Sequence, residues 1–300
     1  MNVTAPDLGG SRAMSRAAEE GRSLWDDARA RLMRNKAAVT SVWLLGGLVI
    51  IAVFGPMVWP HNYDAIYRDR VAISPTFENF HILGTDMLGR DLAVRLMVGL
   101  RVSLAVGVIA TCVSLVIGVA WGATAGYLGG RVDQIMMRIV DVIYAMPFIF
   151  FVILLTVVFG QNIFLIFLAI GAVEWLTMAR IVRGQTLTLR QREFVEAARA
   201  SGVPPVKIVT RHIVPNLLGP VAVYVTLTLP VVILAESFLS FLGLGVNEPL
   251  TSLGLLISEG RENMSKLWLL LAPALTMVSA LLALNFIGDG LRDAIDPRDR

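Results

Sequence analysis

The residues in this 300-residue chain that could do chemistry are few, and most stand alone. A phosphate-binding P-loop ends in Gly-Lys followed by Ser or Thr, because the lysine reaches the phosphates and the hydroxyl holds magnesium. Each of the three lysines, Lys36, Lys207 and Lys266, follows a residue other than glycine. The sequence therefore predicts that this chain does not hydrolyse ATP itself and has no cofactor of its own.

The histidines and the cysteine give no stronger signal. There is no HExxH motif, and His61, His81 and His212 fall in segments that the topology below places on both sides of a membrane, so we expect no metal site. Cys112 is the only cysteine and cannot form an intrachain disulfide. Without a nucleophile–base pair or a metal set, a membrane-embedded enzyme is a weak alternative.

Isolated carboxylates inside apolar runs are the remaining candidates. A charge at the centre of a membrane helix costs about 3 kcal/mol, so such groups usually face the bundle interior or a cavity. Glu236 either lines a path or pairs inside the bundle, or it lies in solvent near the outer interface. For Glu174 we expect an ion pair with Arg180. We expect Asp141 to begin a helix, where a carboxylate favours the positive end of the helix dipole.

The elements that position these residues are membrane spans. The chain is 56% hydrophobic and 16% charged, and about 20 apolar residues cross a bilayer as helix. We predict an all-α membrane protein with an N-terminal segment, residues 1–36, and a transmembrane domain, residues 37–300. The six predicted spans are residues 37–59, 102–128, 142–160, 161–179, 218–242 and 267–288.

The basic residues orient these spans. With a cytoplasmic N-terminus, 19 of the 26 Lys and Arg residues fall in cytoplasmic segments, so both termini are predicted inside. Residues 60–101 then form an outside loop, and residues 180–217 form the main cytoplasmic loop. The net charge is only +3 and there is no basic stripe, which argues against nucleic-acid binding.

Residues 22–36 favour a short amphipathic helix. Leu24, Trp25, Ala28 and Leu32 share one helical face, which is typical of a helix lying on lipid at the cytoplasmic surface. The alternative is a poorly ordered charged tail.

The stretch EFVEAARASG, residues 193–202, interrupts the apolar chain. Residues 190–201 have helical composition, with pairs of opposite charge expected between Glu196 and its neighbours Arg192 and Arg199. Gly202 is a natural C-terminal stop. The predicted face joins the small side chains of Ala197 and Ala198 to Phe194, and could pack closely on another protein. The alternative is a solvated helix without a partner.

The spacing of this stretch resembles a known signature. Glu196-Ala197-Ala198, then Gly202, then a group ending in Pro215 resembles the motif of permease subunits of bacterial ABC importers. The resemblance implies a type I importer architecture in the bacterial inner membrane. It also implies that the helix before the glycine is the coupling helix that docks on an ATPase subunit. The residues expected at that interface are Glu193, Phe194, Glu196, Ala197, Ala198 and Gly202.

Other stretches are similar to the C-type subunits of oligopeptide, dipeptide and nickel permeases. They include GTDMLGRD, residues 84–91, and NFIGDGLRDAIDPRDR at the C-terminus. This resemblance implies a related B-type permease partner, two ATPases that bind ATP and magnesium, and an external peptide-binding protein. Oligopeptides are the implied cargo, although similar subunits handle dipeptides, modified peptides and nickel.

Two alternatives stay open at this point. Asp86, Arg90 and Asp91 in the outside loop either contact the binding protein or the mouth of the path, or they cap a loop that packs on the membrane surface. In addition, an ion-coupled secondary transporter would use Glu236 and Glu174 as ion sites and would need no ATPase.

Overall fold

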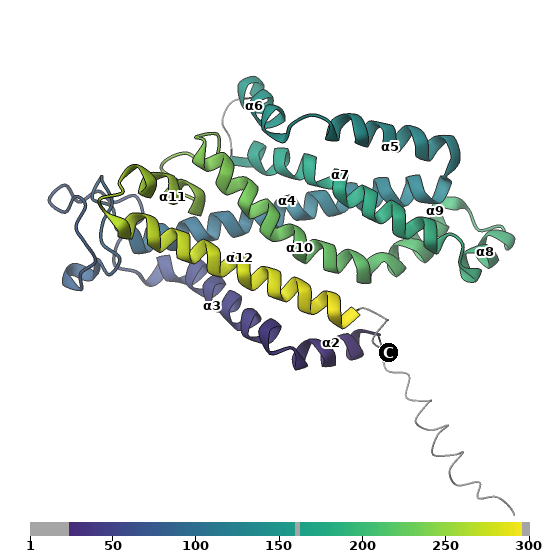
Figure 1. The fold of residues 1–300 in the computed structure, drawn as a ribbon, viewed down its shortest axis with the longest axis horizontal. Coiled ribbons are helices and arrows are strands. Elements are labelled where there is room, and N and C mark those ends of the chain that lie inside the picture. The colour runs from purple at the N-terminus through teal and green to yellow at the C-terminus, as the bar shows by residue number, and fades with distance from the viewer. Residues whose placement is uncertain (1–23, 160–162, 296–300) are drawn as a thin grey trace, which may run out of the picture.

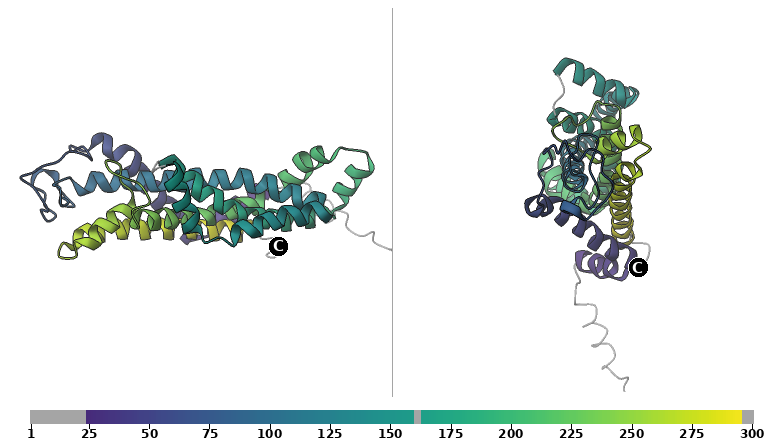
Figure 2. Two further views of the ribbon diagram at one scale, coloured as in Figure 1. Left: turned by 90° about the horizontal axis from the view of Figure 1, so that it is seen from above. Right: turned by 90° about the vertical axis from the view of Figure 1, so that its left-hand side faces the viewer.

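A computed structural model describes residues 24–159 and 163–295 of the chain. The described residues form an elongated helical bundle, in which α8 lies at one end and α11 and the loop before α4 lie at the other (Figures 1 and 2). The helices that make up the bundle are α2 (Leu24–Arg34), α3 (Lys36–Val58), α4 (Leu92–Leu128), α5 (Gly130–Tyr144), α6 (Phe148–Phe159), α7 (Ile163–Leu189), α8 (Glu193–Ala200), α9 (Pro205–Ile208), α10 (Val214–Phe241), α11 (Leu253–Glu262) and α12 (Leu267–Ile295). A 3₁₀ turn, η1 (Glu78–Phe80), and a π-helical turn, η2 (Val209–Ile213), complete them.

The centre of the bundle is the packing of α4 on α7. Gly118, Gly122 and Gly126 repeat every four residues along α4 and face α7. A Cβ atom at Gly122 would lie 2.4 Å from the backbone oxygen of Ala179, so only glycine permits this approach. Small residues at this spacing let membrane helices approach closely, where dispersion replaces the hydrophobic effect as the driving force.

The all-α membrane architecture is confirmed. α3, α4, α12 and the continuous segment Pro205–Phe241 are each long and apolar enough to cross a bilayer. The pair α5 and α6 could make a fifth, broken span, bent by 81°. The remaining predicted span, residues 161–179, falls in α7, which does not meet the same length-and-composition test among the described residues, so the count of six stays a prediction.

Several helices extend beyond the spans that the sequence predicted. The span expected at 142–160 is a bent pair whose first helix begins at Gly130, and the bend lies at Pro147, which disfavours helix at the residue before it. Asp141 therefore lies near the end of α5, where it cannot serve the start of a helix. The helix expected to end at 179 continues to Leu189, because backbone hydrogen bonds persist after the apolar run stops.

The helix that contains the second predicted span also begins before that span. α4 begins at Leu92, inside the predicted loop 60–101, because the side chain of Asp91 accepts a hydrogen bond from the backbone N–H of Val94 at 3.0 Å and caps the helix. The predicted helix near the N-terminus is present as α2. Its Leu32 lies close to Gly290 of α12, so α2 packs on the end of the last helix. The rest of the predicted N-terminal segment, residues 1–23, lies outside the described residues.

Candidate functional site

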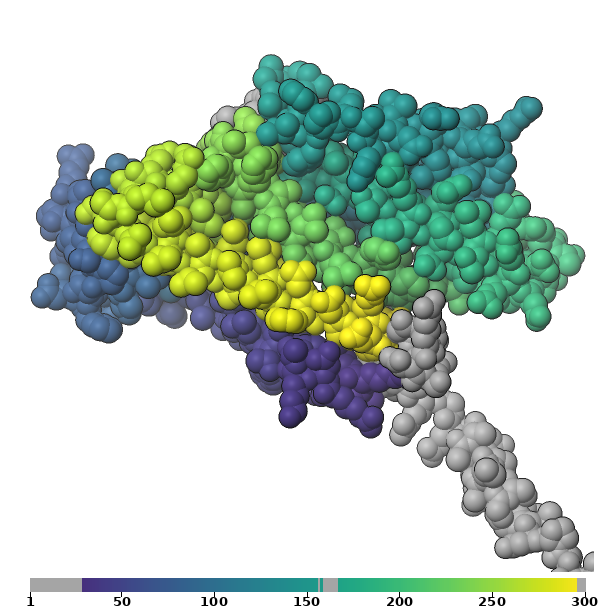
Figure 3. Space-filling model, viewed as in Figure 1, coloured from purple at the N-terminus to yellow at the C-terminus, as the bar shows by residue number. Residues whose placement is uncertain are grey.

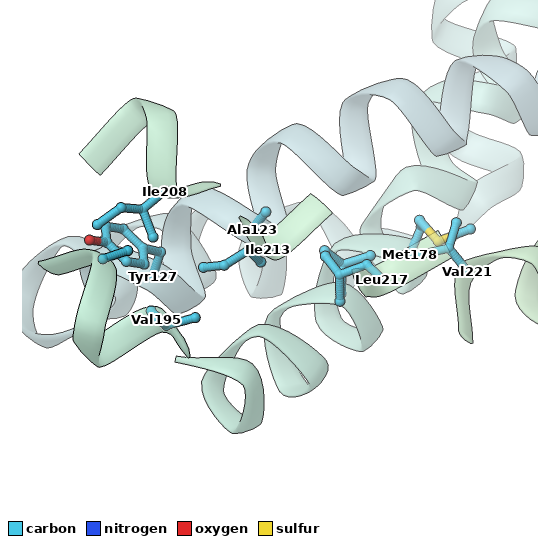
Figure 4. Packing of buried hydrophobic residues seen from close by; sticks show 10 residues of the cluster. Ala123, Tyr127, Met178, Val195, Ile208, Ile213, Leu217 and Val221 are labelled. Atoms are coloured by element: carbon cyan, nitrogen blue, oxygen red, sulfur yellow. The ribbon is translucent and has the colours of Figure 1, made fainter. Parts of the chain in front are cut away.

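One face of α8 packs against the bundle and anchors the helix there. Val195 is fully buried and Ala198 is 8% exposed. Both join a cluster with Tyr127 at the end of α4 and with Ile208 and Ile213, which lead into α10 (Figure 4). The short helix is therefore held by side chains from two long helices, and it cannot move far without moving them.

The end of α8 is closed by a Schellman motif. The N–H of Gly202 donates to the carbonyl of Arg199 at 3.0 Å, and the N–H of Val203 donates to the carbonyl of Ala198 at 3.1 Å. Gly202 has φ of +73°, a left-handed conformation that is unfavourable for residues with a Cβ atom. The glycine of the motif thus fixes where the helix ends and where the chain turns back to α9.

The other face of α8 is exposed at the tip of the molecule (Figure 3). Glu193, Phe194, Glu196, Ala197 and Gly202 are all exposed, with the Phe194 side chain 41% accessible. The structure corrects the predicted interface in one respect, because Ala198 faces the bundle three residues after Val195.

The expected ion pairs on α8 are also absent. Glu196 forms no ion pair with Arg192 or Arg199 within this described helix, and the Arg199 guanidinium instead lies 5.7 Å from the ring centroid of Tyr127. The charges of the exposed face are therefore left for solvent or for another protein.

A π-helical turn joins α8 and α9 to α10. η2 contains Arg211, His212 and Ile213, the last of which is fully buried. Pro215 follows directly after this turn, and because proline has no N–H it cannot donate a backbone hydrogen bond to the preceding turn. The two halves of the sequence motif, Ala198 and Ile213, meet in one cluster, which explains their fixed separation along the chain.

At the opposite end of the bundle, a buried ion network joins the outside loop to α11. The Asp86 carboxylate accepts hydrogen bonds from Arg90 Nε at 2.6 Å and from Arg95 Nη1 at 2.5 Å. Arg95, which is 1% exposed, also makes a two-bond pair with Glu259 of α11 at 2.7 and 2.9 Å. Such fork-shaped arginine–carboxylate pairs fix orientation as well as distance.

Arg90 extends this network to the loop before α11. Its Nη1 donates to Glu248 at 2.8 Å. Burial alone would lower the pKa of Arg90, but its hydrogen bonds to Asp86 and Glu248 and their negative charges raise that pKa above the ordinary arginine value. Arg90 is therefore charged at every physiological pH. Asp86 and Arg90 are both buried within the chain itself, which supports a role in holding the outer end together.

Asp91 belongs to a second buried cluster in the same loop. Besides capping α4, its carboxylate accepts from Trp59 Nε1 at 3.0 Å and pairs with His81 Nδ1 at 2.8 Å. His81 and His61 stack with ring centroids 4.4 Å apart. The two histidines of the predicted outside loop thus lie together, and His61, His81 and Asp91 offer ligand atoms that all lie within 4.8 Å of one another.

The ring nitrogens of both histidines have hydrogen-bond partners within the protein, which is more typical of a closed structural cluster than of a metal site. Arg70 can only donate, so His81 Nε2 accepts from it at 3.2 Å, and His81 Nδ1–H donates to Asp91. The carbonyl of Asn79 can only accept, so His61 Nε2–H donates to it at 2.7 Å. A metal ion would have to displace partners from both rings.

Glu236 is fully buried in α10 among hydroxyl groups. Ser240 donates to Oε1 at 2.7 Å and Ser103 of α4 donates to Oε2 at 2.9 Å, with Ser237 at 3.4 Å. Ser252, the cap of α11, is hydrogen-bonded to Ser240 at 3.2 Å. The carboxyl group therefore pairs inside the bundle, as one of the two sequence interpretations expected, and it joins α4, α10 and the start of α11.

The predicted pair between Glu174 and Arg180 is wrong. Arg180 Nη2 instead donates to Asp141 of α5 at 2.9 Å, and its guanidinium stacks 4.2 Å from the centroid of Tyr144. The sequence missed this pairing, the Arg95–Glu259 pair and the contact of Ser103 with Glu236, because these partners are far apart in the chain. Ser240 was within reach of the sequence, since it stands four residues after Glu236 on the same helix. Val195 was within reach of the sequence, since it stands three residues before Ala198 on one helical face.

Comparison with known families gives two matches. Residues 118–300 match the family described as binding-protein-dependent transport system inner membrane component. Residues 23–75 match the N-terminal transmembrane domain of oligopeptide transport permease C. Together the two matches cover α2, α3, about the last third of α4 and every helix after it in the described part of the chain.

Curated relatives match over nearly the whole chain. It is 54% identical to the oligopeptide transport system permease protein OppC of Escherichia coli (strain K12), over 94% of this chain and 93% of the relative. It is 52% identical to the protein of the same name in Haemophilus influenzae, over 94% and 91%. In Bacillus subtilis (strain 168), the corresponding values are 40% identity over 100% and 98%.

A solved structure supports the fold independently. The chain is similar to a chain of the MetNI methionine ABC transporter in an inward-facing conformation, with a TM-score of 0.56 and 20% identity. The alignment covers 67% of this chain and 96% of the other. At this identity, the likeness concerns the arrangement of helices only.

Proposed function

This chain belongs to the family of binding-protein-dependent transport system inner membrane components, and we propose that it is the permease subunit of an ABC importer that carries peptides, oligopeptides above all, across the bacterial inner membrane. The observation that carries the proposal is identity above 50% to oligopeptide permease proteins over 94% of the chain. The exposed, firmly anchored α8 supports it, because an importer driven by separate ATPases needs such a contact.

In this proposal the subunit does not hydrolyse ATP. Two ATPase subunits bind ATP and magnesium and dock on the exposed face of α8, and a related B-type permease completes the path. An external binding protein delivers the peptide to the end that carries the loop of residues 59–91. Both termini lie in the cytoplasm. For ATP to drive transport, α8 must engage the two ATPase states with different affinity.

Site-directed cross-linking tests this arrangement. In a Cys112→Ser background, Ala197→Cys places a single thiol on the exposed face of α8, and Phe77→Cys places one in the outer loop, where the side chain is 88% exposed. With the whole operon expressed, we expect the Ala197 thiol to cross-link to an ATPase. We expect the Phe77 thiol to react with a membrane-impermeant reagent added outside.

The opposite pattern of labelling would overturn the assigned orientation. Peptide uptake driven by an ion gradient, with this chain reconstituted alone, would overturn the assigned energy source and favour the ion-coupled alternative. Under the proposal, the chain alone moves no peptide, and uptake requires the ATPases, ATP and the B-type subunit.

A further inference from the structure

A charged recess of about 820 Å³ lies between α5 and α7. Its walls include Gln134, Arg138 and Asp141 from α5 and Arg180 and Arg183 from α7. The volume is within the range of small-molecule sites. None of these residues belongs to the α8 surface or to the outer ion network, so the recess needs its own explanation.

The charges of the recess are not balanced. Arg183 is held by Asp133 through two hydrogen bonds of 2.5 and 2.6 Å. Arg180 is held by Asp141, yet it uses only one of its five N–H groups there, and the Asp141 side chain remains 53% exposed. Arg138 is exposed and has no ion-pair partner in the described part of the chain. The recess therefore presents unused cationic donors beside an open carboxylate.

This recess continues along a polar face of α7. Glu174, Thr177, Arg180, Gly184 and Thr188 lie on one side of that helix, and each is exposed or half-buried. Charged groups are costly against lipid and usually face a cavity or another protein. Because α7 leads directly to α8, this face lies on the route between the outer end and the coupling end.

We propose that the recess contacts the charged ends of a peptide one after the other on its way through the permease, with Arg138 and Arg180 binding the C-terminal carboxylate and Asp141 binding the N-terminal ammonium. This inference rests on the proposed function. A guanidinium matches a carboxylate with two parallel hydrogen bonds, and the stacking of Arg180 on Tyr144 at 4.2 Å holds it in place for that contact. A peptide with free ends carries charges of both signs, and the recess offers a partner for each of them.

The experiment uses the complete transporter with its binding protein in liposomes. Uptake is measured for one peptide with a free carboxylate and for its C-terminal amide, in wild type, Arg138→Gln and Arg131→Gln. Arg131 lies exposed on the same helix outside the recess and is the matched control. The binding protein is identical throughout, so its own preference cancels when the ratio of the two uptake rates is compared between variants.

We expect Arg138→Gln to lower the free-acid to amide ratio about threefold to tenfold, which is the fold-change for losing a partly solvated charge-assisted hydrogen bond. Arg131→Gln should leave the ratio unchanged. Asp141→Asn should lower the ratio between a free-amine peptide and its N-acetyl form. An unchanged free-acid to amide ratio in Arg138→Gln overturns the inference.

A lipid headgroup is the competing occupant, and a second arm separates it. The measurements are repeated in phosphatidylcholine vesicles and in vesicles rich in phosphatidylethanolamine. If Arg138→Gln changes uptake according to the headgroup and not according to the peptide terminus, the recess is a lipid site and the inference is overturned. Failure of the wild-type complex to import either peptide with ATP would instead overturn the proposed function.

Discussion

Substitutions on the two faces of α8 should impair transport in different ways. Val195 is fully buried against the bundle, whereas Phe194 beside it is exposed. Val195→Ala removes two methyl groups from the anchor. At about 0.8 kcal/mol per buried carbon, plus a cavity contribution, the change costs about 2 kcal/mol. That energy lowers the ratio of attached to detached α8 about thirtyfold.

The consequence is a loss of coupling rather than of assembly. Under the proposed function, the exposed face of a partly detached α8 still binds the ATPase, but its movement reaches α4 and α10 less often. We expect Val195→Ala to reduce the peptides imported per ATP hydrolysed, while the ATPase still co-purifies and hydrolyses ATP. Phe194→Ala, the matched variant on the exposed face, should instead reduce the amount of ATPase that co-purifies.

The assay is the reconstituted complex, with uptake and phosphate release measured in the same vesicles. Circular dichroism of the purified complex confirms that both variants are folded. The reasoning is refuted if Val195→Ala releases the ATPase, or if Phe194→Ala retains it and lowers only the coupling ratio. Either result would mean that the two faces have the opposite roles.

Three further outcomes follow from the bundle. Gly122→Leu should separate α4 from α7 and lower the thermal unfolding midpoint in detergent, because the Cβ of the new side chain would meet the backbone oxygen of Ala179. Gly46→Leu should leave the midpoint unchanged, since the space around Gly46 is open. Asp86→Asn should lower the free energy of unfolding by about 3 kcal/mol, because two buried arginines lose the anion that they share. In the same thermal melts, Asp69→Asn should cause no measurable change, since Asp69 is exposed. The Glu236→Gln variant should assemble and import normally. Its amide oxygen can still accept hydrogen bonds from the serine hydroxyls, and the hydroxyls can rotate to accept from the amide N–H groups. Reduced uptake with normal assembly would show that the charge itself matters.

The features that the sequence predicted well are those encoded locally. Apolar runs of about 20 residues identified four spans and part of the bent pair, and Gly202 correctly marked the end of α8. Helix ends were predicted less well. Hydropathy falls near Arg180, but the helix continues to Leu189, because arginines are good helix formers and Arg183 finds its anion on α5.

The features that escaped the sequence depend on partners distant along the chain. Arg95 and Glu259 are 164 residues apart, and nothing in either stretch indicates that they will meet. The stacking of His61 on His81 depends on an irregular loop whose path is set by single hydrogen bonds. Ala198 was assigned to the wrong face for a different reason, because Ala197 and Ala198 were treated as one surface although adjacent residues of a helix point about 100° apart.

One helix connects the two ends of this molecule. α4 has 37 residues, so it is about 55 Å long at 1.5 Å per residue. Its last turn provides Tyr127 to the cluster that anchors α8, and its first turn provides Arg95 to the network that holds α11. Glu236 adds a third link through Ser103, about two turns further along α4 than Arg95. A displacement of α8 is therefore transmitted to the outer end by a single continuous helix, and the buried polar clusters there serve to make the outer loop and α11 follow it as one body.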